Sequence, residues 1–160
     1  MKARTLAVAI ASAFSIAATT LPALAAESHD HGHPAAAGMK LSLDEGRKWA
    51  TDAPLRQGMS RIRTAFESRF EAIHKGALTA EESRTLGREA EAQMAYIVSN
   101  CKLTPAADAN LHVVLGELQG SLDGLRKSSG PEATRAAERA VRALNTYGDY
   151  FDHPGWKALS

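Results

Sequence analysis

Residues 52–73 read DAPLRQGMSRIRTAFESRFEAI, and this stretch decides the fold. Its large apolar residues recur at steps of three or four positions, which places them on one face of an α-helix. They are Leu55, Met59, Ile62, Phe66, Phe70 and Ile73. Asp52 is a typical helix N-cap, and Pro54 suits the first helical turn. The stretch therefore predicts a helix that continues to Ile73 and is stopped by Gly76.

The same period recurs in three further segments, each with a start signal of its own. Thr79 precedes Glu82 by three residues, which is the spacing of a capping box. Thr104, followed by a proline, and Pro131 begin the next two segments, and Pro154-Gly155 closes the last one. The inward positions are Leu86, Ala90, Met94, Ile97 and Cys101, then Ala107, Leu111, Val114, Leu118, Leu122 and Leu125, then Ala137, Ala140, Val141, Leu144, Tyr147 and Phe151.

Four long helices with short connections must run antiparallel to their neighbours along the chain. Ser42 and Glu45 also have capping-box spacing, which predicts a short additional helix through Trp49. No segment alternates apolar and polar residues as a half-buried strand would. We therefore expect an all-α domain over residues 41–160, an up-down-up-down four-helix bundle with a short N-terminal helix.

Residues 1–26 have the composition of a signal peptide. Lys2 and Arg4 precede an apolar, alanine-rich run that ends in small residues, so we expect cleavage near Ala25 or Ala26 and a periplasmic protein. The alternative, a membrane anchor, fits less well because the apolar run is short. No second apolar run is long enough to cross a bilayer, so we expect no membrane insertion after cleavage.

Composition and charge exclude several classes of protein. Charged residues make up 23% of the chain and hydrophobic residues 44%, which is typical of a globular domain. The net charge is +1, and it becomes −1 without Lys2 and Arg4, so we expect no nucleic-acid partner. A single cysteine excludes covalent haem attached through Cys-x-x-Cys-His. Phosphate loops, nucleophile elbows and His-Glu-x-x-His are absent, so we expect no enzymatic activity.

The segment of residues 27–40 is rich in histidine. Its first part reads ESHDHGHPAAAG, without periodicity or large apolar residues, so we expect a disordered tail. His29, His31 and His33 place three imidazoles close together on a flexible chain, and such a chain can bind copper, nickel or zinc. The alternative is a solvated linker without a ligand.

A second candidate metal site lies at one end of the predicted bundle. Counting residues from each turn brings Cys101 to the level of His153, and a thiol with an imidazole can hold a copper or zinc ion. The alternative is that Cys101 is a small buried apolar residue. Met59 and Met94 face each other in one expected core layer, where they could bind Cu(I) but more often only fill space. Met59 with His153 could also hold a non-covalent haem.

Gly116, Gly120 and Gly124 recur every four residues on the predicted helix face opposite the leucines. Each glycine costs about 1 kcal/mol of helix stability relative to alanine. A row of small residues lets a second helix approach closely, which favours a homodimer through this face. The alternative is an outer face that is merely flexible.

Two runs of this chain resemble a group of small, uncharacterised exported proteins of Gram-negative bacteria. The first run lies within residues 96–112 and contains Tyr96-Ile97-Val98, Asn100-Cys101-Lys102-Leu103, Pro105-Ala106-Ala107-Asp108 and Leu111-His112. The second run is residues 147–156, YGDYFDHPGW. The resemblance implies a periplasmic location and a helical fold but no established activity. The expected architecture is also similar to that of the periplasmic bundle cytochromes of the b562 and c′ types, at the level of the fold alone.

The sequence thus favours a periplasmic accessory protein of metal homeostasis, with copper as the first candidate. We expect His29, His31 and His33 to capture the ion, and Cys101 with His153 to form a second site. The alternative from another class is a helical adaptor or stress protein that acts through protein–protein contacts.

Overall fold

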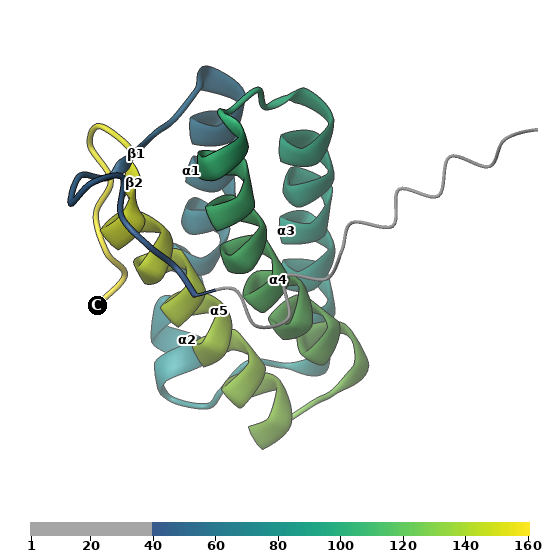
Figure 1. Cartoon of the computed structure of the whole chain (residues 1–160). Helices are drawn as coiled ribbons and strands as arrows, with labels where there is room; N and C mark the ends of the chain where they lie inside the picture. Colours follow the sequence, from purple (N-terminus) through teal and green to yellow (C-terminus); the bar gives the residue numbers. More distant parts are fainter. Residues whose placement is uncertain (1–39) are drawn as a thin grey trace, which may run out of the picture. The chain divides into compact units, whose positions relative to one another are not determined.

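The computed structural model describes residues 40–160, and they form an all-α fold (Figure 1). The helices are α1 (Ala53–Glu67), α2 (Phe70–His74), α3 (Ala80–Asn100), α4 (Pro105–Lys127) and α5 (Pro131–Tyr150). Two short strands, β1 (Trp49–Ala50) and β2 (Phe151–Asp152), pair in parallel. The predicted signal peptide and His29, His31 and His33 lie outside the described residues.

Each long helix packs against the next long helix along the chain, α1 on α3, α3 on α4 and α4 on α5, while α2 packs on α5. Their apolar faces meet in one core, as the periodicity predicted. The largest fully buried side chains include Tyr147, Phe66, Phe151, Leu55, Met59, Ile62, Leu86, Ile97, Leu111 and Leu118. Among the predicted inward residues, Phe70, Cys101 and Val141 are only partly buried. No described helix combines the length and apolar character needed to cross a membrane.

The predicted N-caps of α1, α3 and α4 are confirmed. A carboxylate oxygen of Asp52 accepts a hydrogen bond from the backbone N–H of Leu55, at 2.9 Å. Thr79 and Glu82 form the reciprocal capping box, with distances of 3.2 and 2.9 Å. The Thr104 side chain caps α4 in the same way as Asp52 caps α1. These side chains satisfy backbone donors that have no partner inside the helix.

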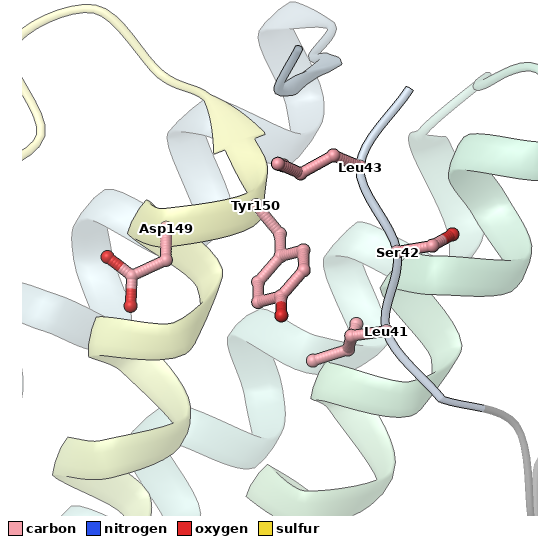
Figure 2. A pocket seen from close by; sticks show the side chains of 5 residues that line it. All are labelled: Leu41, Ser42, Leu43, Asp149 and Tyr150. Atoms are coloured by element: carbon pink, nitrogen blue, oxygen red, sulfur yellow. The ribbon is translucent and has the colours of Figure 1, made fainter. Parts of the chain in front are cut away.

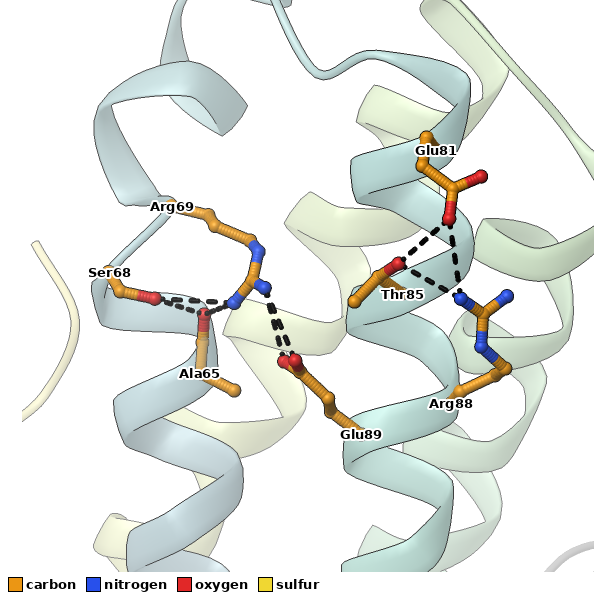
Figure 3. Close-up of polar contacts among 7 residues, drawn as sticks. All are labelled: Ala65, Ser68, Arg69, Glu81, Thr85, Arg88 and Glu89. Atoms are coloured by element: carbon orange, nitrogen blue, oxygen red, sulfur yellow. Dashed lines mark hydrogen bonds and ion pairs between the residues drawn. The ribbon is translucent and has the colours of Figure 1, made fainter.

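The helix predicted to continue to Ile73 is instead interrupted at Ser68 and Arg69, between α1 and α2. Figure 3 shows how side chains replace the missing backbone bond: the carbonyl of Ala65 accepts from the Ser68 hydroxyl (2.9 Å) and the Arg69 guanidinium (3.1 Å). Arg69 also pairs with Glu89 of α3, at 3.2 Å. The apolar period continues across the break, and for this reason the sequence pattern did not reveal it.

The short helix predicted through Trp49 is also wrong. Asp44 and Arg47 exchange backbone hydrogen bonds of 2.8 and 2.9 Å across a tight turn, in which Glu45 has φ +50° and Gly46 has φ +84°. Two successive positive φ angles are typical of hairpin turns, and a glycine in second place favours them. This local geometry excludes a helix, so the capping-box spacing from Ser42 was misleading.

The end of α5 comes earlier than the Pro154-Gly155 signal predicted. The helix stops at Tyr150, and the chain becomes extended so that Phe151 and Asp152 pair with β1. A strand of two residues is too short to produce an alternating pattern, so this pairing could not be predicted from the sequence.

Candidate functional site

Residues 151–160, which we call the C-terminal strap, join α5 to α1. Arg63 of α1 donates a hydrogen bond to the backbone carbonyl of Lys157, at 2.5 Å. The side-chain amide of Asn145 on α5 forms two hydrogen bonds with the backbone of Leu159, at 3.0 and 2.8 Å. The strap therefore holds together two helices that are far apart in the sequence.

His153 is the central residue of the strap, because both of its ring nitrogens have partners. Nδ1 lies 3.0 Å from the hydroxyl of Tyr147 on α5, and Nε2 lies 3.2 Å from the hydroxyl of Ser60 on α1. Tyr147 is fully buried, so its hydroxyl needs a partner inside the protein. The imidazole supplies this partner and extends the connection to the exposed Ser60.

Aromatic side chains surround this hydrogen-bonded chain. The ring of Tyr147 stacks on Phe151 with centroids 5.2 Å apart, and it meets Trp156 edge to face at 4.8 Å. Gly148 makes room for Trp156, because a Cβ atom at this position would lie 2.4 Å from the indole ring. A glycine is therefore required here, inside a helix where it would otherwise be unfavourable.

The surroundings keep the imidazole and the phenol neutral. Burial lowers the pKa of His153 below its ordinary value of 6.5, and the cation of Arg56 lowers it further, while Asp152 opposes both effects. Burial also raises the pKa of Tyr147 far above its ordinary value of 10.0. At neutral pH this pair therefore acts through hydrogen bonds between uncharged groups.

Cys101, the other predicted ligand in this region, lies half-buried at the C-terminal end of α3. Burial raises the pKa of its thiol above 9.0, and the carboxylates of Asp52 and Asp108 raise it further by repelling a thiolate. Asp52 also accepts a hydrogen bond from the backbone N–H of Lys102, at 2.5 Å. The thiol therefore stands in negative surroundings and is protonated at neutral pH.

Asp52 acts electrostatically on Cys101 and on the hydrogen-bond partner of the other predicted ligand, His153. Its charge raises the pKa of Cys101 and also that of Tyr147, the hydrogen-bond partner of His153. Cys101 therefore lies near the beginning of α1, whereas His153 contacts Ser60 in the middle of that helix, and no contact joins the two ligands among the described residues. Within residues 40–160, the structure has no group of three or more His, Cys, Asp and Glu side chains placed to hold a metal ion.

Two residues of this region were not found by sequence reasoning. Ser60 and Arg56 lie on the polar side of an amphipathic helix, where a single serine or arginine gives no periodic signal. Gly148 did carry a usable signal, because a glycine inside a helix often marks the close approach of another group.

A shallow pocket of about 470 Å³ lies between the chain before β1 and the end of α5 (Figure 2). Its lining consists of Leu41, Ser42, Leu43, Asp149 and Tyr150. Figure 2 shows the ring of Tyr150 turned toward the extended chain of residues 41–43 and the carboxylate of Asp149 turned away from it. This pocket therefore offers mainly apolar surface and the phenol of Tyr150.

The predicted glycine face of α4 is only partly an open surface. Gly116 and Gly120 are exposed, and beyond the adjacent backbone of α4 no atom lies within 4 Å of the position that a Cβ would take on either. Gly124 instead faces α5, where a Cβ would lie 2.8 Å from the Cβ of Ala136. The small size of Gly124 allows close contact between α4 and α5 within the chain. The four-residue spacing of the glycines could not show this. Met59 and Met94 are both buried in the core.

In comparisons with known proteins, no family model matches this chain, and no curated protein and no solved structure matches it either. The resemblance to exported bacterial proteins and to bundle cytochromes therefore stays a prediction.

We expect His153 in the metal-free protein to titrate below pH 6.5, because burial disfavours its charged form. Between the folded and unfolded pKa values, the unfolded chain binds more protons, so this histidine's contribution to stability falls as the pH drops through 6.5. Proton NMR of the ring checks the value. Asp152→Asn should lower the pKa further, and a value above 6.5 in the wild type would contradict the burial argument.

We expect Gly148→Ala to destabilise the protein by about 1–3 kcal/mol, because the new methyl group must displace Trp156. Gly116→Ala is the matched control: it is the same substitution on open surface and should stabilise α4 by up to about 1 kcal/mol. Urea denaturation measures both. Equal effects of the two substitutions would show that the indole does not pack on Gly148.

Proposed function

We propose that this protein is an exported, non-enzymatic metal-binding accessory of the periplasm, with copper as the first candidate and zinc as the second. The observation that carries the proposal is the spacing of His29, His31 and His33, which puts three imidazoles within five positions of the chain. Imidazole is a good ligand for both ions, and a flexible chain can adjust to the geometry that either requires.

The helical domain of residues 41–160 serves in this proposal as a rigid carrier of the histidine-rich tail. The packing of α1 on α3, α3 on α4 and α4 on α5 supports an up-down-up-down four-helix bundle, because the long helices that follow each other are also neighbours. The strap supports the same role, since it ties the end of the domain back onto α1.

Cys101 and His153 form the proposed second site. The carboxylates of Asp52 and Asp108 make the surroundings of the thiol negative, which favours a cation there. Binding has a cost at both ligands: the thiol must lose its proton, and His153 must give up a hydrogen bond, such as the one to Ser60. We therefore expect this site to be weaker than the tail.

Metal analysis and titration of the exported protein, purified without an affinity tag or chelator, test the proposal. We expect about one equivalent of Cu(I), Cu(II) or Zn(II) at the tail, and an affinity at least about tenfold lower when His29, His31 and His33 are all changed to Ala. Cys101→Ala and His153→Asn should affect only the weaker site. His74→Ala is the control, because this exposed histidine on α2 belongs to neither site.

Weak, substoichiometric binding that is the same in the wild type and in every variant would refute the metal-binding function.

The second candidate is an adaptor or stress protein that acts through protein–protein contacts. The open surface above Gly116 and Gly120 favours it, because a partner helix could approach the backbone of α4 closely there. This candidate predicts a homodimer in solution that Gly120→Leu abolishes without loss of helical content, measured by sedimentation and circular dichroism. Association that persists in Gly120→Leu would exclude the glycine face as the interface.

A further inference from the structure

Five arginines of the helical domain pair with a carboxylate on a helix, whereas the three arginines of α5 have no such partner within the part of the chain that the structure describes. The ion pairs between residues of the helices are Arg63–Glu67, Arg69–Glu89, Arg84–Glu81, Arg88–Glu81 and Arg126 with Glu91 and Asp123. Arg135, Arg139 and Arg142 are exposed and follow each other at steps of four and three residues. They therefore share one face of α5. Glu132 and Glu138 lie on the same face, three or four residues from these arginines, but within the described residues neither glutamate forms an ion pair with them.

Two of these arginines line a polar pocket of about 250 Å³ between the end of α4 and the beginning of α5. Gly124, Ser128 and Glu132 complete its lining. A Cβ at Gly124 would lie 3.3 Å from Nη2 of Arg139, so the guanidinium rests against the backbone of α4. Since one water occupies about 30 Å³ of liquid, the pocket has room for a tetrahedral oxyanion and several waters.

The donors in this pocket suit an anion. Each guanidinium presents planar pairs of N–H groups that match the oxygens of a phosphate, and the hydroxyl of Ser128 is a further donor. Glu132 contributes the opposite charge, but its carboxylate forms no ion pair with Arg135 or Arg139 among the described contacts. The lining therefore keeps a net positive charge, with both guanidiniums available.

We propose that the pocket between Arg135 and Arg139 binds an oxyanion of the phosphate type, either free phosphate or the phosphomonoester headgroup of a lipid. Two guanidiniums hold the anion from the side of α5, and the end of α4 closes the pocket on the other side. The proposal rests on residues of the helical domain alone and is independent of metal binding by the tail.

Titration with sodium phosphate at constant ionic strength, followed through the backbone amide NMR signals, tests the proposal. We expect saturable shifts at Gly124, Ser128 and Gly130, and an affinity lower by about tenfold or more in Arg135→Ala/Arg139→Ala, because charge-assisted hydrogen bonds are lost. Glu132→Gln should tighten binding, since it removes the only negative charge of the lining. Arg142→Ala is the matched control and should leave the affinity unchanged.

A second measurement separates the two sources of the anion. Phosphatidylcholine vesicles with and without phosphatidic acid are sedimented with the wild type and with Arg135→Ala/Arg139→Ala. Co-sedimentation that needs phosphatidic acid and both arginines identifies a lipid headgroup, while binding of free phosphate alone identifies the soluble ion. The proposal is overturned if neither phosphate nor phosphatidic acid binds, or if the double variant binds as the wild type does while circular dichroism shows both to be folded.

Discussion

The buried hydroxyl of Tyr147 imposes a constraint that explains much of the structure at one end of the helices. A buried hydroxyl without a partner costs about 1–3 kcal/mol, so the chain must bring a polar group to it. His153 is that group, and it can reach Tyr147 only because the chain turns back after α5. The same return places Trp156 on Gly148 and connects the imidazole to Ser60 of α1. The need of the Tyr147 hydroxyl for a hydrogen-bond partner thus accounts for the position of the strap, the aromatic cluster and the link between α1 and α5.

The helices were predictable wherever their signals are local. Asp52, Thr79 and Thr104 marked the beginnings of helices correctly, because an N-cap acts on backbone groups only two or three residues away. The break between α1 and α2 was not predicted, because it depends partly on the contact of Arg69 with Glu89, twenty residues further along the chain. The apolar period also continues across the break. The ion pair that Arg69 forms is visible only once α1 and α3 lie side by side.

In the candidate sites too, the residue types could be predicted from the sequence, but their three-dimensional arrangement could not. Cys101 and His153 could be selected because thiols and imidazoles are rare and chemically distinctive. Their surroundings could not be predicted, since Ser60 is 93 residues from His153 and nothing in either local sequence relates the two. The arginines of α5 entered no prediction, because arginines at helical spacing are usual on a solvated face, and only the structure shows that two of them border a pocket.

The parallel pairing of β1 with β2 has a consequence for the order of folding. Thr51 and Asp152, which are joined by a hydrogen bond at the end of this pair, are 101 residues apart in the sequence. Closing a loop of that length in a flexible chain costs about 4 kcal/mol of entropy, more than a few exposed hydrogen bonds return. The two strands can pair at a small cost in chain entropy only after the helices have already brought them together. The pairing of β1 with β2 is therefore a late step of folding, made on a helical domain that is already assembled.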